Sequence, residues 1–491
     1  MAQFHSVLSR RDFMKGLGLA GAGVGAAAAV SPVFRDLDEM ASAPSARVNM
    51  PWWVKQVNET TTPIDWDVLP TLGPAYKGPP PMGLIPPAYP ESEIFRMKMD
   101  RILEKYPNWD KGANTLGFPG ASSDPEYPDY VGDIKDNALV MGAALLNMGM
   151  FPKELIMATH GAYMGLTDHP EGWRIMPAVE QRGGTKWQGT PEEALKIVRA
   201  AVRFYGFDDV TAIPVDDHFL KVMYGEKWLI THGAPTTFEF GDVDDIVCTP
   251  AIRPTKIVLP RRMKWFLQFS SRQPGEVTRH ALGTAQNAGQ AYYYTSWVKI
   301  VKSIQDFLWG LGYISLDNCN GRFAPTGATG ILAGAGELAR WGGVMTPKYG
   351  ISVRVMHGVL TDLPLEECKP IDFGGRKFCE TCGICADACP MGAISKDEPT
   401  WDAAKPYQYG GYLTWRTDMA VCSHCPVCQG TCPFNAFDKS GVHELVKGTV
   451  ANTSIFNGFF TSMDKSFDYG RKPPEEWWNS EQPVTGIDTS I

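Results

Sequence analysis

Residues 378–390 read FCETCGICADACP, and residues 421–433 read VCSHCPVCQGTCP. Each stretch has the cysteine spacing C-x2-C-x2-C-x3-C, followed by a proline. Thiolates at this spacing bind three corners of a cubane iron–sulfur cluster, and the fourth cysteine of each run binds the other cluster. The spacing therefore predicts two [4Fe–4S] clusters. Their expected ligands are Cys379, Cys382, Cys385 and Cys432 for the first, and Cys422, Cys425, Cys428 and Cys389 for the second.

Two other interpretations of these cysteines are weaker. A single C-x-x-C pair would also suit a zinc site or a redox pair, but eight cysteines in two complete runs are far more specific. Four disulfides would leave the spacing unexplained, and also Pro390 and Pro433, which turn the chain away after the fourth ligand. The other cysteines stand alone and are predicted to be small buried hydrophobic residues: Cys248, Cys319 and Cys368.

The amino-terminal segment Ser9–Lys15, SRRDFMK, has the pattern of a twin-arginine export signal. The run that follows, residues 16–30, is rich in Gly and Ala and is too short and too weakly apolar for a membrane anchor. We assign residues 1–43 to the signal, with cleavage between about residues 30 and 46. Export of an already folded chain suits a protein whose clusters are assembled in the cytosol.

The overall charge gives no sign of a nucleic-acid partner. The 491 residues carry a formal net charge of −8, so the chain lacks the basic surface that binds phosphate backbones. No other run of eighteen apolar residues occurs, and the mature chain is therefore expected to be soluble, with any membrane attachment supplied by a partner. The length allows two or three domains with a large core.

Helix and strand signals alternate in the middle of the chain. Thr190, Pro191 and Glu193 form a capping box with proline at the first helical position, which predicts a helix that runs to Tyr205 and ends at Gly206. An apolar strand is expected to follow at residues 210–215.

A second unit repeats this pattern. We expect a helix over residues 289–309, a break at Gly310-Leu311-Gly312, and a strand over residues 313–316, with residues 255–269 as further strand. A helix is also expected at residues 134–150. Two helix–glycine–strand units predict an α/β core.

The chain after the signal is predicted to fall into four segments. Residues 44–130 are dense in Pro, Trp and Tyr and are predicted to wrap around the core, which covers residues 131–365. The cluster module covers residues 366–442. The aromatic tail, residues 443–491, is predicted to pack back on the core.

A stretch rich in small residues lies between residues 320 and 350 and is predicted to be a loop. Glycines allow backbone N–H groups to approach a ligand closely, and a helix start after them favours an anion. Four glycines are the candidates for cofactor binding: Gly327, Gly330, Gly334 and Gly336. The match to a dinucleotide fingerprint is weak, because no acidic residue follows at the ribose position. A turn without a ligand explains the stretch equally well.

Taken together, the export signal at residues 9–15, the run ISVRVMHGVLTDLP at residues 351–364 and the paired cluster motifs resemble the respiratory reductive dehalogenases. These are corrinoid iron–sulfur enzymes of organohalide-respiring bacteria, and the likeness extends over essentially the whole chain. The resemblance implies an α+β or α/β fold, with a nitroreductase-like corrinoid-binding core and a C-terminal ferredoxin-like module.

The resemblance also implies a buried cobamide in the base-off form, with no protein histidine below the cobalt. Proteins that do supply a histidine use D-x-H-x-x-G. Here the run that begins at Asp216 carries His218 but ends in Lys221, so His218 is expected to be structural or exposed.

The family uses a tyrosine as proton donor, with a basic residue and an asparagine nearby. Transferred to this chain, the donor is Tyr294, with Arg354 and Asn320 as companions. A cation beside a phenol lowers its pKa and makes it a better acid near neutral pH. The donor could be displaced by one position within the run Tyr292–Tyr294, and Arg354 could instead form a structural ion pair. Trp415 is a candidate wall of the cofactor pocket, with an ordinary core tryptophan as the alternative.

The resemblance implies reductive dehalogenation of a small organohalide, a chlorinated alkene or aromatic, as the terminal step of anaerobic respiration. It places the enzyme on the outer face of the cytoplasmic membrane, held by a small membrane-anchor protein and fed by a respiratory electron donor. Two alternatives are a corrinoid iron–sulfur reductase similar to epoxyqueuosine reductase, and an exported two-cluster electron-transfer subunit without catalysis. Acidic charge and export oppose the first alternative. The second leaves the long segment before Cys379 without a purpose.

Overall fold

The structure is a computed structural model. It describes residues 50–51, 53–71, 178–181, 183–228, 235–249, 255–281, 285–318, 323–404, 408, 410–419, 421–422, 425–435, 441–467, 470–474 and 476–481, all within the unit Met50–Ile491. Several predicted features lie outside these residues: the export signal, the helix at 134–150, most of the segment 44–130, Cys319 and Asn320.

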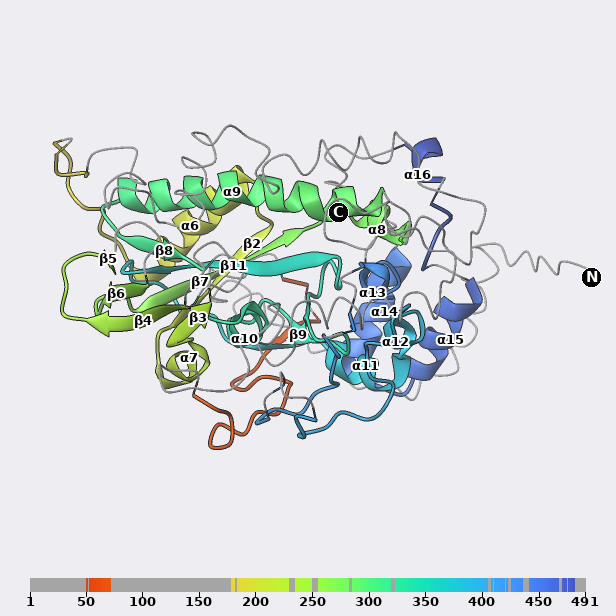
Figure 1. Cartoon of the computed structure of the whole chain (residues 1–491). Helices are drawn as coiled ribbons and strands as arrows, with labels where there is room; N and C mark the ends of the chain where they lie inside the picture. Colours follow the sequence, from red (N-terminus) through yellow and green to blue (C-terminus); the bar gives the residue numbers. More distant parts are fainter. Residues whose placement is uncertain are drawn as a thin grey trace, which may run out of the picture. The chain divides into compact units, whose positions relative to one another are not determined.

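A four-stranded antiparallel sheet forms the centre of the core, with the strand order β2-β7-β11-β8. Figure 1 shows α6 and the long helix α9 over one face of this sheet, and α10 and α7 on the other side. The bounds are β2 Asp209–Pro214, β7 Trp265–Arg272, β8 Ser315–Asp317, β11 Val353–Thr361, α6 Pro191–Tyr205, α7 Asp217–Val222, α9 Gln286–Gly310 and α10 Thr326–Leu332. Because every pair in this sheet is antiparallel, the arrangement is α+β rather than a set of parallel α/β units.

Both predicted ends of α6 are confirmed. The side chain of Thr190 accepts a hydrogen bond from the Glu193 N–H, and the Glu193 carboxylate accepts one from the Thr190 N–H at 2.8 Å. Gly206 ends the helix with φ 117°, a left-handed conformation that favours glycine. The strand that follows is β2, shifted by one residue from the prediction.

The second predicted unit is also found, with one correction. Helix α9 runs from Gln286 to Gly310, and β8 follows after Gly312 at φ 90°. The predicted single strand over 255–269 is wrong, because a turn at Arg261-Arg262 separates two strands, and these join different sheets. The first, β6, belongs to a second sheet with the order β3-β4-β6-β5, in which β4 and β6 are parallel. The bounds are β3 Glu226–Trp228, β4 Pro235–Gly241, β5 Val247–Thr249 and β6 Lys256–Pro260.

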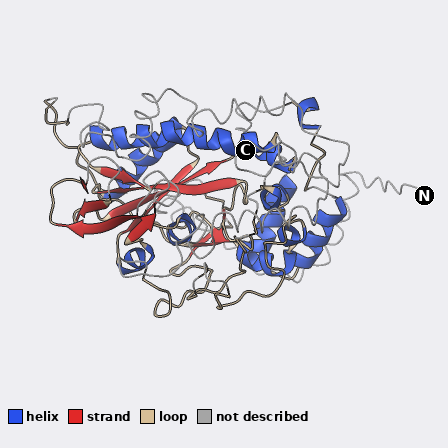
Figure 2. Ribbon diagram, viewed as in Figure 1, coloured by secondary structure: helices blue, strands red, loops and turns tan. Residues whose placement is uncertain are grey.

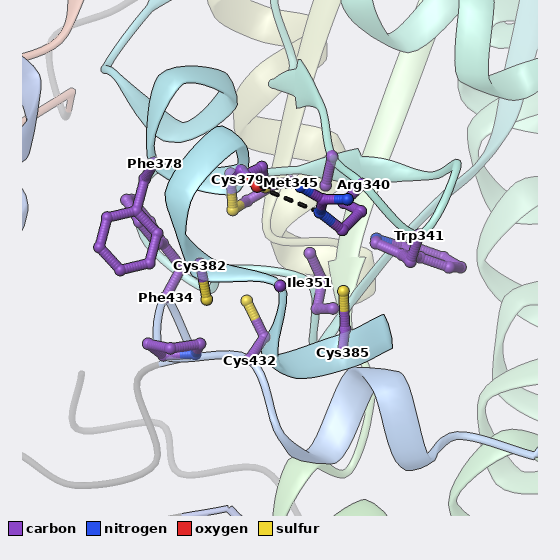
Figure 3. A pocket seen from close by; sticks show the side chains of 13 residues that line it. Arg340, Trp341, Met345, Ile351, Phe378, Cys379, Cys382, Cys385, Cys432 and Phe434 are labelled. Atoms are coloured by element: carbon purple, nitrogen blue, oxygen red, sulfur yellow. Dashed lines mark hydrogen bonds between the residues drawn. The ribbon is translucent and has the colours of Figure 1, made fainter. Parts of the chain in front are cut away.

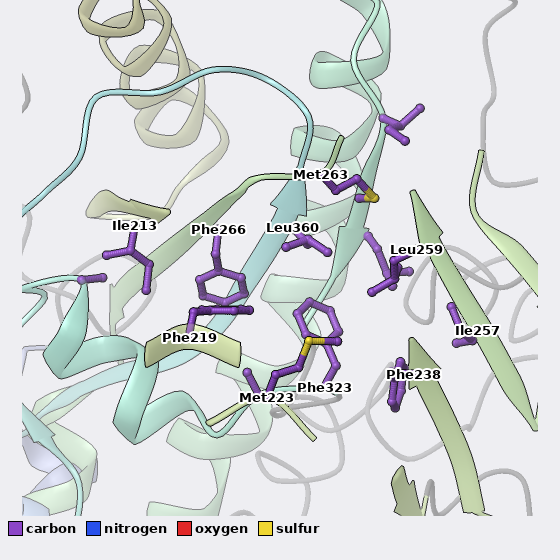
Figure 4. Close-up of a cluster of buried hydrophobic side chains, with 14 residues drawn as sticks. Ile213, Phe219, Met223, Phe238, Ile257, Leu259, Met263, Phe266, Phe323 and Leu360 are labelled. Carbon is purple, nitrogen blue, oxygen red and sulfur yellow. The ribbon is translucent and has the colours of Figure 1, made fainter. Parts of the chain in front are cut away.

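A hydrophobic cluster joins the two sheets and α7 (Figure 4). Phe266 of β7 lies at its centre, with ring centroids 5.1 Å from Phe219 and 6.1 Å from Phe323. Met263 and Leu360 are also fully buried there. Each such side chain contributes about 1.5–3 kcal/mol to folding, so this cluster holds the two sheets against each other.

Residues 326–332 of the small-residue stretch form the helix α10, so the prediction of a loop is wrong for this part. Gly327 and Gly330 lie inside α10. A Cβ at Gly330 would meet Val355 Cγ1 at 2.8 Å, and one at Gly336 would meet the Met345 carbonyl oxygen at 2.0 Å. These two glycines therefore allow close packing against β11 and β10 (Val344–Met345), which is a structural reason for glycine at both positions.

The cluster module is made of short helices with small strand pairs beside them (Figure 2). Helices α14 and α15 pack against α11 of the cluster module. The predicted return of the tail to the core is observed further along, where Arg471 Nε and the Lys472 N–H donate to the carbonyls of Ala281 and Arg279. The strand β1 near the beginning of the described chain pairs with β12 just before α11. The bounds are α11 Gly375–Cys382, α12 Ile384–Asp387, α13 Val427–Gly430, α14 Gly441–Asn452, α15 Asn457–Phe467, α16 Glu476–Asn479, β1 Lys55–Gln56, β9 Glu337–Leu338, β10 Val344–Met345 and β12 Ile371–Asp372, with α8 at Gly275–Arg279.

Candidate functional site

Four motif cysteines line one pocket in the cluster module (Figure 3). Cys379 and Cys382 come from α11, Cys385 comes from α12, and Cys432 follows α13. Gly383, with φ 66°, separates the first two helices and lets the chain reverse within the motif. The pocket thus combines three cysteines of the first motif with the fourth cysteine of the second.

The other four cysteines gather at a second place. Cys389, Cys422 and Cys425 pack against one apolar cluster that includes Met391 and Val427. The thiol of Cys428 has Cys425, Cys422 and Cys389 among its electrostatic neighbours, together with Cys385 of the first set. The structure therefore brings together the two sets that the spacing predicts, including the exchange of the fourth cysteine.

All eight motif cysteines are thiols rather than disulfides. Burial raises the pKa of Cys379 to about 12 and that of Cys382 to about 11, and it raises the pKa values of Cys385, Cys428 and Cys432 well above the ordinary range. A coordinating metal deprotonates such thiols outright. These buried sulfurs therefore fit a cationic guest, which would convert them to thiolates.

Backbone N–H groups point at several of these sulfurs. The N–H of Ala393 donates to Cys389 Sγ at 3.3 Å, and those of Ile384 and Phe434 donate to Cys382 and Cys432. Hydrogen bonds to cysteine sulfur are among the factors that set the potentials of iron–sulfur clusters. Among the described residues, no three His, Cys, Asp or Glu side chains converge closely enough for a single metal ion. The thiols line a cavity instead, as a guest of several atoms requires.

Trp415 lies beside the first set and is only 1% exposed. The guanidinium carbon of Arg340 lies 4.6 Å from its ring centroid, and that of Arg376 lies 5.0 Å away. Both arginines are buried, at 5% and 4% exposed. Both cations thus lie against the ring of the tryptophan that was a candidate wall of the cofactor pocket.

Glu337 is a buried carboxylate close to the same helix. Its two oxygens accept hydrogen bonds from the N–H groups of Phe373 and Arg376, at 2.5 and 2.7 Å, at the start of α11. A carboxylate at this position satisfies N–H groups that have no partner within the helix. Burial nevertheless raises the pKa of Glu337 to about 7. The sequence offered no signal for this contact, because residues 337 and 373–376 meet only in the fold.

The run of three tyrosines lies on α9 as predicted, and its members have different surroundings. Tyr292 is 37% exposed, whereas Tyr293 is 4% exposed and its ring stacks 5.7 Å from that of His357 on β11. Trp297, one helical turn further on, stacks on the same imidazole at 4.2 Å. The backbone of Tyr294 is part of α9, but its side chain lies outside the described residues.

Arg354 and His357 are neighbours on β11, on either side of a register shift. Arg354 is half-buried. Burial of the His357 ring, the larger cause, and the nearby charge of Arg354 lower the pKa of His357 to about 3. Within the described part of the chain, neither ring nitrogen of His357 has a hydrogen-bond partner. The structure thus places the predicted Arg354 on the sheet face covered by the tyrosine helix, beside a neutral imidazole that sequence reasoning did not single out.

His218 is exposed at the start of α7 and stacks on Trp66 with a 4.0 Å centroid distance. Of the lone cysteines, Cys368 is buried as predicted, and Cys248 is half-buried against the core.

The whole chain is similar to curated enzymes. It is 32% identical over 552 residues to the chloroethene reductive dehalogenase of Dehalococcoides mccartyi strain VS, and the alignment covers 99% of both chains. The chain belongs to the reductive dehalogenase family. It is also 31% identical over 559 residues to the trichloroethene reductive dehalogenase of Dehalococcoides mccartyi strain 195, an alignment covering 100% of this chain and 99% of that one.

Family models and solved structures agree with this assignment. Residues 158–365 match the family described as reductive dehalogenase subunit, and residues 378–436 match the 4Fe-4S dicluster domain. The catabolic reductive dehalogenase NpRdhA has the same fold, with a TM-score of 0.53 at 15% identity over 88% of this chain and 50% of that chain. This reductive dehalogenase is therefore an oxidoreductase that acts on carbon–halogen bonds. The alternative of an electron-transfer subunit without catalysis is wrong.

Proposed function

We propose that this reductive dehalogenase removes chloride from a small chlorinated ethene, in the terminal step of anaerobic organohalide respiration. The observation that carries the proposal is the similarity over 99% of both chains to a chloroethene reductive dehalogenase, combined with two complete sets of cysteines. The second relative is named for trichloroethene. A chlorinated aromatic is the alternative substrate class.

The two cysteine sets hold two [4Fe–4S] clusters in this proposal. Cys379, Cys382, Cys385 and Cys432 bind the first, and Cys422, Cys425, Cys428 and Cys389 bind the second. The cavity lined by the first set, the gathering of the second set against one apolar cluster and the N–H groups directed at the sulfurs support it. The clusters carry electrons singly toward the reaction site.

The reaction itself requires a cobamide, which supplies low-valent cobalt as the reducing centre. This part of the proposal rests on the family, in which one solved relative is linked to a mechanism for B12-dependent dehalogenation. The buried imidazole of His357 supports a polar guest on the α9–β11 face, since neither of its ring nitrogens has a partner among the residues that the structure describes. The base-off form and the likeness of the core to nitroreductases remain predictions. So does the cofactor role of Gly327, Gly330, Gly334, Gly336 and Trp415.

Proton delivery is assigned to Tyr294, with Arg354 as the cation that favours its ionisation and Asn320 as a hydrogen-bonding companion. The position of the tyrosine run on the helix that covers β11 supports this assignment. Tyr292 is less suited than Tyr293, because its side chain is 37% exposed. Tyr293 already packs on His357, so it is the alternative donor.

We further propose that the enzyme is exported by the twin-arginine pathway to the outer face of the cytoplasmic membrane. In the described part of the chain, no helix has the length and apolar character needed to cross a bilayer. A small membrane-anchor protein and a respiratory electron donor complete the proposed assembly.

The test is chloride release by the purified enzyme, prepared without oxygen and supplied with cobamide and a strong one-electron reductant. A panel of chlorinated ethenes, chlorinated benzenes and chlorophenols at equal concentration separates the substrate classes. The proposal predicts turnover of at least one chlorinated ethene and little or none of the aromatics. Turnover of aromatics alone would overturn the substrate assignment, and no chloride from any compound by enzyme with full cobalt and iron would overturn the function.

A further inference from the structure

Arg340 places a cation on the wall of the first cysteine pocket. Its side chain lines the cavity with Cys379, Cys382, Cys385 and Cys432 (Figure 3) and is only 5% exposed. An arginine guanidinium stays protonated in proteins. The pocket that holds four sulfurs therefore also holds a fixed positive charge.

The guanidinium is held by carbonyl oxygens rather than by a carboxylate. Its Nε and Nη2 donate to the Cys379 carbonyl at 3.1 and 3.0 Å, and Nη1 donates to those of Ser395 and Asp397 at 3.0 and 3.1 Å. Among the described residues, no acidic side chain forms an ion pair with it. Its charge is thus oriented by the backbone but not neutralised by a counter-ion.

The ring of Trp415 stacks on this guanidinium, with 4.6 Å between the guanidinium carbon and the ring centroid. The indole is fully buried and keeps water away from the cation. An unscreened charge in such surroundings acts more strongly on nearby groups than it would in water. Arg340 lines the same cavity as the four sulfurs, so its charge acts on a group bound between them.

We propose that Arg340 is a positioning residue that raises the reduction potential of the cluster bound by Cys379, Cys382, Cys385 and Cys432. The inference deepens the proposed function and rests on it for the presence of that cluster. One-electron reduction adds one negative charge to the pocket, with the electron taken from the external donor, and no proton is needed. A buried cation stabilises the reduced form more than the oxidised form. Arg340 thereby makes this cluster reducible by a weaker donor.

The experiment compares the intact enzyme with Arg340→Gln, Arg340→Lys and a matched control, Arg416→Gln. Arg416 also donates to backbone carbonyls, those of Trp401 and Tyr412, and lies 4.6 Å from the Tyr412 ring, but it does not line the cysteine pocket. Iron per chain is measured first. A redox titration followed by electron paramagnetic resonance then gives the potential of each cluster.

Arg340→Gln is expected to make the one-electron reduction of one cluster about tenfold less favourable, a fall of about 59 mV, while the other cluster changes less. Arg340→Lys, which keeps the charge, is expected to change the same equilibrium by less than about threefold. Arg416→Gln is expected to leave both potentials unchanged.

An Arg340→Gln enzyme with full iron and unchanged potentials would overturn the inference, as would an equal fall in Arg416→Gln. If the Gln variant loses iron, Arg340→Met serves as the second neutral variant. If neither neutral variant binds full iron, Arg340→Lys is the deciding variant. A reduction that is tenfold less favourable in this variant, which keeps the charge, would exclude a charge effect. Wild-type enzyme with only about four irons per chain would instead contradict the two-cluster proposal itself.

Discussion

The cysteine module and the α9–β11 face of the core hold their candidate residues in different ways. In the module, each motif supplies three thiols from one short stretch, and folding adds a single cysteine from the other motif. On the α9–β11 face, Tyr293 and His357 come from a helix and a strand far apart in sequence, and they meet only because α9 covers the sheet. The difference shows that a site made of local spacing can be predicted by position, whereas one made across elements can be predicted only by region.

The largest expected effect is in the module. Cys385→Ala removes one ligand from a pocket of four, and we expect the loss of one cluster, about four irons per chain, with dehalogenation abolished. Iron analysis of protein purified without oxygen checks this. Cys368→Ala is the matched control, because Cys368 is buried but lies outside both motifs. Unchanged iron in Cys385→Ala would contradict the ligand assignment.

On the α9–β11 face, the strongest expected effect comes from the tyrosines. Tyr294→Phe removes the proposed proton donor, and activity is expected to fall by about 10²–10⁴-fold, with cobalt and iron contents unchanged. Tyr292→Phe, at the exposed position, is the control and should retain activity. If Tyr294→Phe is fully active and Tyr293→Phe is not, the donor is the tyrosine that packs on His357.

The sequence predicts the ends of α6 more successfully than the structure of the stretch around Gly327 and Gly330. The α6 capping box and the glycine that ends the helix are local signals, and the structure reproduces both. By contrast, Gly327 and Gly330 were predicted to lie in a loop, because glycine is common there. They lie in α10 instead. The contact with Val355 that requires a small residue at 330 is tertiary, so the local sequence gives no sign of it. No local pattern marks Arg340 or Glu337 either, because their partners around α11 are also distant in sequence.

The glycines give a prediction that separates packing from ligand binding. Gly336→Ala would force a Cβ to within 2.0 Å of the Met345 carbonyl oxygen, and we expect destabilisation of about 1–3 kcal/mol. Gly327→Ala meets nothing within 4 Å and replaces a helical glycine, so stability should rise by up to about 1 kcal/mol. Thermal unfolding of both variants measures this. Loss of cobalt in a stable Gly327→Ala enzyme would show that this glycine contacts the cofactor.

The smallest expected effect is a change in acid sensitivity on the α9–β11 face. Because the pKa of His357 is lowered to about 3, the folded chain leaves this ring neutral between pH 6.5 and 3, where the unfolded chain binds a proton. Stability therefore falls as the pH is lowered through this window. His357→Phe keeps the stacking with Trp297 and removes the titration, so its unfolding midpoint should fall less between pH 7 and 5. Equal slopes for the wild type and His357→Phe would contradict the buried neutral imidazole.

The central claim is that one chain holds a cobamide in its core and two cubane clusters in its cysteine module. Cobalt and iron per chain, measured on enzyme purified and reconstituted without oxygen in the presence of cobamide, test it most directly. About one cobalt and about eight irons is the predicted result. About eight irons with no cobalt would leave the module intact but contradict the cobamide chemistry proposed for the core.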